Sequence, residues 1–185
     1  MSFDDEIKKA ESNIRRLAKK AGDRSAAALV DASHKARDRA VNRIADQVLL
    51  DKSYIRQRIE VLAAKKDELG WSAEVRAFRR GVLLTRFAHT AVFGPRKSGD
   101  GQKQVGISGQ ITPQKSYRSS FFYIALKSGA MGIAKRTERT GRDNYKVLYG
   151  PSVSQVYASV REDIAGEVQL DLQQALQSQL EQLYG

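Results

Sequence analysis

The sequence contains no cysteine, only two histidines and three prolines, and no long apolar run. Without cysteine the chain has neither disulfide bonds nor thiolate metal sites. Its longest uninterrupted apolar stretch, residues 121–126, is far shorter than the roughly 18 residues that a membrane-spanning helix needs. The first residues carry acids in place of an apolar core, so we expect no secretory signal. We therefore expect a soluble protein made in a cytoplasm, not associated with a membrane and long enough to bury a core.

Positive charge is concentrated in the middle of the chain. Residues 1–51 carry a net charge of +2, residues 52–150 carry 20 basic and 7 acidic residues for a net of +13, and residues 151–185 carry a net of −4. We therefore predict an N-terminal helical region (1–51), a basic β-rich domain (52–150) and a C-terminal helix (151–185). A field of this sign favours nucleic acid, acidic protein surfaces or anionic lipid, and does not choose among them.

Helical periodicity marks both ends of the sequence. Apolar residues recur every three or four positions from Ile7 to Ala21 and again from Leu29 to Val48, which predicts two helices with a break at Gly22-Asp23. Asp23 or Ser25 would cap the second, which would run to Leu50. Ser53 is expected to start a short helix over residues 54–59. At the other end, a stripe from Val153 to Leu183 predicts one long helix, and Ser152 with Gln155 fits a capping box.

The middle of the chain has the patterns of strands and turns. We predict a hairpin of residues 61–65 and 73–77, strands at 82–87 and 105–111, and a buried strand at 121–126 whose turn, Lys127-Ser128-Gly129, leads into a return strand at 131–135. Residues 94–106 and 136–144 are glycine-rich or basic and are expected to form long loops. The predicted class is therefore α+β, with N-terminal helices, a small antiparallel β-rich middle with long basic loops, and a long C-terminal helix.

Catalytic constellations are sparse. His34 has no second metal ligand at helical spacing, and His89 follows a predicted strand without an acidic cluster near it in the sequence. His89 is the one candidate general base, for a small nuclease that His89→Ala would inactivate. We expect no enzyme, no catalytic residue, no cofactor and no metal.

The basic residues are the main candidates for binding. They are interpreted either as a solvated surface or as contacts to DNA phosphates or to acidic neighbouring proteins. The candidate contacts are Arg76, Arg79, Arg80, Arg96, Lys97, Lys103, Arg136, Arg139 and Arg142.

Three segments of the sequence form a recognisable set: the run from Phe121 to Gly129, the run from Met131 to Arg136, and Leu148-Tyr149-Gly150-Pro151-Ser152. Together they resemble the phage minor tail protein Z family. Their order, between a helical N-terminus and a closing helix, is similar across most of the chain. One departure is Gly129-Ala130-Met131-Gly132-Ile133-Ala134, where family members usually have Gly-x-x-Gly-Val-Phe.

The resemblance implies a structural minor tail protein that completes the tail at its head-proximal end, where the tail joins the neck and DNA passes. It implies a virion protein that forms a homo-oligomeric ring, with six copies as one expectation. Its partners would be further copies of itself, the tail terminator, tail tube or neck proteins, and DNA in the channel.

Leu148, Tyr149, Gly150 and Pro151 are a candidate inter-subunit corner, because proline fixes φ and glycine adopts conformations closed to other residues. The competing hypothesis is a basic nucleic-acid-binding module. It would place Lys52, Arg56 and Arg58 on a short recognition helix, and it predicts a monomer or dimer that binds duplex DNA tightly.

Overall fold

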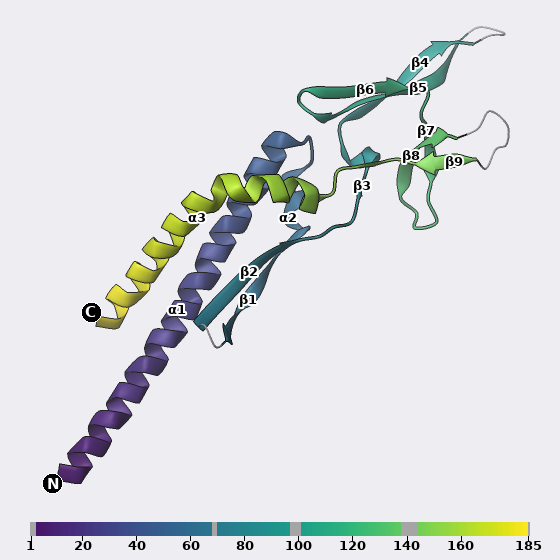
Figure 1. The fold of residues 1–185 in the computed structure, drawn as a ribbon. Coiled ribbons are helices and arrows are strands. Elements are labelled where there is room, and N and C mark those ends of the chain that lie inside the picture. The colour runs from purple at the N-terminus through teal and green to yellow at the C-terminus, as the bar shows by residue number, and fades with distance from the viewer. Residues whose placement is uncertain (1–2, 68–69, 97–100, 138–143, 185) are drawn as a thin grey trace. The chain divides into compact units, whose positions relative to one another are not determined.

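The computed structural model describes residues 3–67, 70–96, 101–137 and 144–184. A long helix lies at each end of the chain with antiparallel strands between them in sequence, which confirms the predicted α+β class (Figure 1). The elements are α1 (Phe3–Gln47), α2 (Lys52–Arg56), β1 (Ile59–Asp67), β2 (Gly70–Ala77), β3 (Val82–Leu83), the 3-10 turn η1 (Leu84–Arg86), β4 (His89–Pro95), β5 (Gln102–Thr112), β6 (Lys115–Ser119), β7 (Phe122–Ala125), β8 (Met131–Arg136), β9 (Tyr145–Val147), β10 (Tyr149–Gly150) and α3 (Val153–Tyr184).

The chain forms two compact units. The first contains Met1–Ala40, Ile59–Arg76 and Arg161–Gly185, and the second contains Val41–Arg58 and Ala77–Val160. Both long helices therefore contribute to both units. The division of the sequence into three domains stays a prediction.

A single helix replaces the two that the sequence predicts near the N-terminus. α1 continues through Gly22, so the predicted break there is wrong. A Cβ at Gly22 would lie 3.4 Å from Trp71 Nε1, so the glycine is in packing contact with β2 rather than at a turn. Ser25 does not cap a new helix, because its hydroxyl donates to the Ala21 carbonyl at 2.9 Å. The alanine-rich sequence that follows offsets the roughly 1 kcal/mol that a helical glycine costs.

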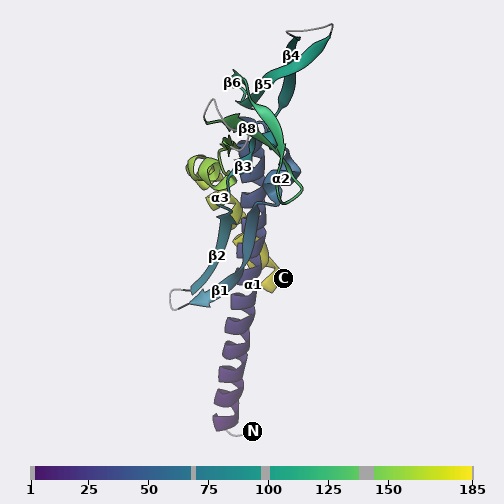
Figure 2. The same ribbon diagram turned by 90° about the vertical axis from the view of Figure 1, so that its right-hand side faces the viewer.

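In the first unit, α1 lies between α3 on one side and the β1–β2 hairpin on the other (Figures 1 and 2). Four alanines at four-residue spacing, Ala28, Ala32, Ala36 and Ala40, are buried along α1. Side chains this small let neighbouring elements approach the helix closely. The hairpin is present as predicted, but its strands are longer: β1 spans Ile59–Asp67 and β2 begins at Gly70.

Two arginines of α1 join it to α3. Arg39 binds Asp171 with two hydrogen bonds, Nε to Oδ2 at 2.7 Å and Nη2 to Oδ1 at 3.1 Å, and its Nη1 also pairs with Glu167. Arg24 donates to the side-chain oxygens of Gln179 at 3.0 Å and Gln182 at 2.9 Å. The two helices therefore run antiparallel in a fixed register. Asp171 is nearly buried, and the hydrogen bond from Arg39 holds its pKa below the ordinary value.

The second unit contains two three-stranded antiparallel sheets, β4–β5–β6 and β7–β8–β9, and the short pair β3–β10. Its largest fully buried side chains come from all three helices and from the strands: Ile44, Ile55, Val82, Ile107, Ile133, Val153 and Val160. The hairpin around Gly129 is confirmed, since Gly129 has φ +79° and Phe122 to Ala125 pair with Ala134 to Met131. β7 is half-buried, however, rather than buried as predicted.

Two predicted boundaries in the second unit are wrong. The strand predicted at residues 82–87 ends at Leu83 and becomes the turn η1, because Phe87 N–H bonds back to the Leu84 carbonyl. The loop predicted at residues 94–106 is shorter, since β4 extends through Pro95 and β5 begins at Gln102. Residues 97–100 and 138–143 of the predicted basic loops lie outside the described residues.

The start of the C-terminal helix is as predicted. The Ser152 N–H donates to Gln155 Oε1 at 2.8 Å, and the Gln155 N–H donates to Ser152 Oγ at 3.1 Å. This reciprocal pair is the capping box that the sequence predicts. It places the beginning of α3 within three residues of Gly150.

The segment Leu148–Pro151 is held by the core of its own unit. Leu148 donates its N–H to the Ile133 carbonyl at 2.8 Å, and Tyr149 and Gly150 pair with Leu83 and Val82. Gly150 is not among the glycines with positive φ, so conformational freedom is not the reason for it. The reason is space: a Cβ there would lie 2.5 Å from Phe87 Cε2. Its role in contacts between subunits stays a prediction.

We predict opposite effects of alanine at two glycines. Gly150→Ala forces its Cβ against the buried Phe87 ring and is expected to lower the free energy of unfolding by about 1–3 kcal/mol. Gly166→Ala meets nothing within 4 Å on α3 and is expected to raise it by up to about 1 kcal/mol. Urea denaturation of both variants measures the difference. If Gly150→Ala did not lower the free energy of unfolding, the contact with Phe87 would have no energetic effect.

Asp171 is expected to make stability dependent on acid pH. Its folded-state pKa lies below the ordinary value of 3.8, so its pairing stabilises the fold fully above that value and ceases to do so as pH falls through the lower folded-state pKa. Asp171→Asn should therefore lower the melting temperature at pH 7, and the gap to the wild type should close below about pH 3.8. Asp163→Asn, at an exposed site on the same helix, is the control and should show no gap at either pH.

Candidate functional site

The structure separates the candidate basic contacts into several local settings. Arg76 belongs to the first unit, where its guanidinium pairs with Glu74 at 3.1 Å in an exposed ion pair. Arg79 and Arg80 are exposed and belong to the second unit. Arg76, Arg79 and Arg80 therefore do not lie on one strand, because β2 ends at Ala77.

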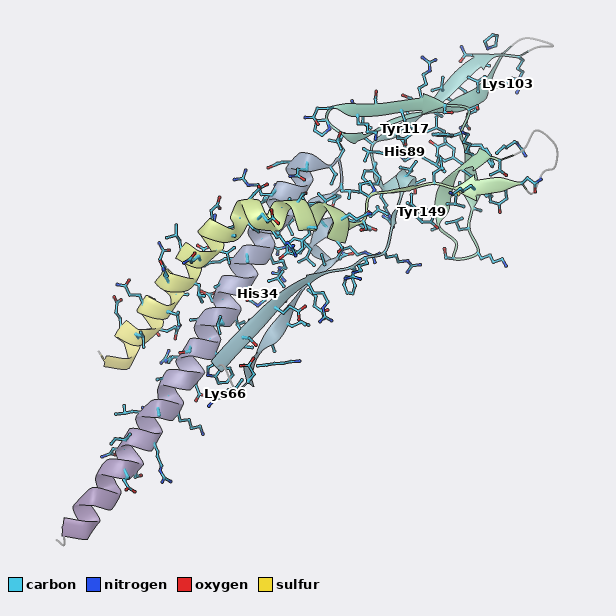
Figure 3. The ribbon with its side chains drawn as sticks, in the orientation of Figure 1. His34, Lys66, His89, Lys103, Tyr117 and Tyr149 are labelled. Carbon is cyan, nitrogen blue, oxygen red and sulfur yellow. The ribbon has the colours of Figure 1, made fainter. Side chains whose placement is uncertain are left out.

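The other described candidates lie at the ends of strands in the second unit. Arg96 follows β4 and Lys103 lies at the start of β5, and both are exposed; Lys103 is labelled in Figure 3. Arg136 ends β8 with its guanidinium 5.2 Å from the centre of the Phe122 ring. Three further candidates, Lys97, Arg139 and Arg142, lie outside the described residues.

A pocket of about 220 Å³ brings together residues that are far apart in the sequence. Three arginines, Arg58, Arg80 and Arg86, line it together with Tyr54 and Tyr149, the latter labelled in Figure 3. The remaining lining is small or apolar: Gly81, Leu83, Leu126, Ser128 and Ala130. We call this the arginine pocket. It unites one candidate basic contact, Arg80, with one residue of the candidate corner, Tyr149.

Two of the three guanidinium groups pack on the same aromatic ring. The Cζ atoms of Arg58 and Arg86 lie 5.2 Å and 5.3 Å from the centre of the Tyr54 ring. Cation–π contacts of this kind orient an arginine without neutralising its charge. Among the residues that the structure describes, none of the three arginines forms an ion pair with a carboxylate. The pocket therefore presents concentrated positive charge that suits an anionic group.

The fold positions Tyr54 through the cap of α2. The Asp51 carboxylate accepts hydrogen bonds from the Ser53 N–H at 2.7 Å and the Tyr54 N–H at 3.2 Å, and from the Ser53 hydroxyl. These bonds hold the pKa of Asp51 below its ordinary value. The hydrogen bond from the Ser53 hydroxyl has the largest effect. Ile55, fully buried, anchors the other face of the turn. Tyr54 is thereby held at the rim of the core, where the arginines reach its ring.

The recognition helix of the competing hypothesis is corrected by the structure. α2 spans Lys52–Arg56 and is capped by Asp51, so the predicted helix over residues 54–59 begins too late and ends too far along. Arg58 lies beyond the helix, and its carbonyl accepts from the Phe78 N–H. Lys52 donates to Asn42 at 2.9 Å. The three basic residues therefore do not share one helix that could enter a groove.

The two histidines lie in different units. His89 donates from Nδ1 to the Phe87 carbonyl at 2.8 Å and packs against Tyr123. Beside it is a hollow whose described lining holds no carboxylate: Ala88, Thr90, Ser108, Gly109, Gln110 and Ser116. His34 lies on α1 beside Ala63 and Ala64 of β1. Within the described part of the chain, no three histidine or acidic residues gather where they could hold a metal ion.

The sequence contains no signal that brings the residues of the arginine pocket together. The sequence patterns place Arg58 on a helix and Arg86 on a strand, so neither is expected beside the other. Tyr54, the ring on which two arginines pack, carries no signal of its own beyond being an aromatic residue in a basic segment. An arginine pocket built from positions 54 to 149 depends on the pairing of β3 with β10, which no local pattern encodes.

Taken together, the chain has the fold of an α+β protein with exposed charged surfaces, and none of its helices, over the residues described, is long and apolar enough to cross a membrane. The sequence model of the family described as prophage minor tail protein Z (GPZ) matches residues 6–184, nearly the full chain. The chain belongs to this family and is therefore a structural protein of the phage tail. No curated protein and no solved structure matches it.

We predict that the arginine pocket dominates the binding of polyanions by the isolated protein. The triple variant Arg58→Ala, Arg80→Ala, Arg86→Ala should bind a short DNA duplex more weakly, with a log–log salt slope smaller by about 0.9 for each phosphate that its arginines no longer neutralise. The control replaces Lys115, Arg118 and Lys146, which are exposed on β6 and β9, and removes the same charge. Fluorescence anisotropy at several salt concentrations measures both. Equal weakening in the two variants would mean that only net charge matters.

Proposed function

We propose that this protein completes the phage tail at its head-proximal end and takes part in joining the tail to the head. The observation that carries the proposal is membership of the minor tail protein Z family over residues 6–184. Its place in the virion would be the end of the tail at which the neck is attached. It acts there as a structural component, through contacts rather than chemistry.

The charge distribution supports a position where DNA passes. Residues 52–150 carry a net charge of +13, and the arginine pocket offers three guanidinium groups without carboxylate partners among the described residues. Phosphates of DNA in the channel are the anions that the proposal assigns to this pocket. An acidic surface of a tail terminator, tail tube or neck protein would give the same charge complementarity, with a smaller dependence on salt.

Assembly as a ring fits the same position. In this proposal several copies of the chain, six as the expected number, form a ring around the tail axis. In a ring each copy repeats the same pocket, so a modest charge on one subunit becomes a continuous positive collar. The segment Leu148–Pro151 is proposed to face a neighbouring copy through Tyr149, which is 57% exposed, while the half-buried Gly150 stays against the Phe87 ring.

The proposed function is tested in a phage whose own gene for this protein is deleted and supplied from a plasmid. Without the protein, we expect lysates to accumulate tails and filled heads that do not join. The wild-type gene on the plasmid should restore joining. The arginine pocket triple variant should restore it poorly, whereas the Lys115, Arg118 and Lys146 variant should restore it well. Electron microscopy of lysates counts joined particles.

A labelled copy gives the position directly. A peptide tag on the chain, located by gold-conjugated antibody on purified tails, should mark the head-proximal end. Label along the tail shaft or at the distal tip would contradict the proposal, as would normal joining in the absence of the gene.

A further inference from the structure

The arginine pocket holds more positive charge than one phosphate inside a DNA strand neutralises. Arg58, Arg80 and Arg86 contribute three charges, and no acidic residue is among the described residues that line the pocket. A phosphodiester carries a single negative charge, whereas a terminal phosphate carries about −1.5 to −2 at pH 7 and has three strongly accepting oxygens. Guanidinium groups bind such oxygens in pairs. A terminal phosphate therefore matches the pocket better in charge and in acceptors.

A carboxylate from an acidic protein matches the pocket less well. It carries one charge and two oxygens, so one bidentate arginine satisfies it. The other two guanidinium groups would have no counter-charge, and covering them with a protein partner would remove their hydration without replacing it. The charge of the pocket therefore favours a phosphate over an acidic side chain.

Two of the arginines are oriented before any ligand binds. The Cζ atoms of Arg58 and Arg86 lie 5.2 Å and 5.3 Å from the centre of the Tyr54 ring, which the cap of α2 holds in place. Side chains that are already ordered lose less conformational entropy on binding. Ser128 adds a hydroxyl donor to the same lining. The pocket is thus prepared for a compact anion with several acceptor oxygens.

The pocket is also larger than a phosphate group. Its volume of about 220 Å³ has room for about seven water molecules at roughly 30 Å³ each, and a phosphate group fills only part of that space. The rest of the lining includes the apolar side chains of Leu83, Leu126 and Ala130. A lining of this kind favours a ligand that carries an apolar body next to its charged group.

Tyr149 provides an aromatic surface for such a body. Its side chain is 57% exposed, lines the pocket and is labelled in Figure 3. The beginning of the side chain rests on Gly81, where a Cβ would lie 3.5 Å from Tyr149 Cβ and Cδ1. The Tyr54 ring is already engaged by two guanidinium groups, so Tyr149 is the ring with free surface. Nucleic-acid bases stack on exposed aromatic rings when they are unpaired, whereas bases inside a duplex are not accessible.

We propose that the arginine pocket binds an unpaired nucleotide that ends in a phosphomonoester, with the phosphate among the three arginines and the base against Tyr149. Two sources carry this chemistry, a nucleoside monophosphate in solution and the phosphorylated end of a DNA strand. The inference deepens the proposed function and rests on it for the presence of DNA at this pocket. Because Tyr149 is also proposed to face a neighbouring copy, the nucleotide would lie where two copies of the ring meet.

The first test asks whether the full chain recognises a terminal phosphate. Short labelled single strands phosphorylated at the 5′ or the 3′ end are compared by fluorescence anisotropy with a hydroxyl-ended strand that is one nucleotide longer and nearly equal in charge. At least one phosphorylated strand should bind about tenfold more tightly than the control. Equal binding of all strands, or binding of none, overturns the inference.

Competition against the bound strand separates the possible ligands. A deoxynucleoside monophosphate that displaces the strand at the strand's own dissociation constant identifies the free nucleotide as sufficient, and much weaker displacement identifies the strand end; both results support the shared chemistry. Inorganic phosphate should compete weakly, because it leaves the apolar lining and Tyr149 without contacts. Displacement by a glutamate-rich peptide at a concentration as low as the nucleotide requires would mean that the pocket is a site for acidic proteins, and would overturn the inference.

The second test concerns the base. Tyr149→Ala should weaken binding of the phosphorylated strand about tenfold, and Tyr149→Phe should preserve it because the ring remains. The control Phe93→Ala removes an aromatic side chain of similar exposure, 59%, and should have no effect. A strand whose end nucleotide lacks its base should bind the wild type and Tyr149→Ala equally, which a general disturbance of the fold would not produce. Equal weakening for strands with and without the end base would contradict a base on Tyr149.

These measurements fail or succeed separately from the joining assay. If the protein does not select phosphorylated ends but its gene is needed for joining, the inference is rejected and the proposed function stands. If it selects them but joining is normal without the gene, the proposed function is rejected and the nucleotide site stands.

Discussion

The pairing of α1 with α3 is the constraint on which the rest of the structure depends. In the first unit Arg39 fixes the register by binding Asp171 and Glu167, and buried alanines allow the close approach. In the second unit the same two helices contribute Ile44, Val153 and Val160 to the core. Each unit is thus completed by residues from both ends of the chain. Neither unit can therefore fold completely until the C-terminal helix has been synthesised.

Local signals in the sequence predict the elements that local interactions hold. The capping box of Ser152 and Gln155 and the turn at Gly129 involve residues within a few positions of each other, and both are present as predicted. The signals fail where distant packing decides the conformation. Gly22 has the pattern of a helix break but lies in a continuous helix beside Trp71, and Gly150 is needed for contact with the Phe87 ring rather than for its conformational freedom.

The candidate site follows the same division. Composition alone locates the positive charge in residues 52–150, and the sequence points to Arg80 and Tyr149 for different reasons. Their union in one pocket with Tyr54, Arg58 and Arg86 depends on one long-range feature, the pairing of β3 with β10, and on one local feature, the cap of α2 at Asp51. A two-residue strand has too little periodicity to be recognised in a sequence. The pocket could therefore be found only once the chain was folded.

Charge is used in two distinct ways along this chain. The arginines of the second unit's pocket have no carboxylate partner among the described residues, and two of them are oriented by an aromatic ring, an arrangement that costs stability unless an anion from outside the chain is present. The charges of the first unit are instead matched at Arg39, which binds Asp171 and Glu167 within the chain. An ion pair inside the chain needs nothing from outside to be neutralised, whereas the arginines of the pocket gain a counter-charge only when an anion binds.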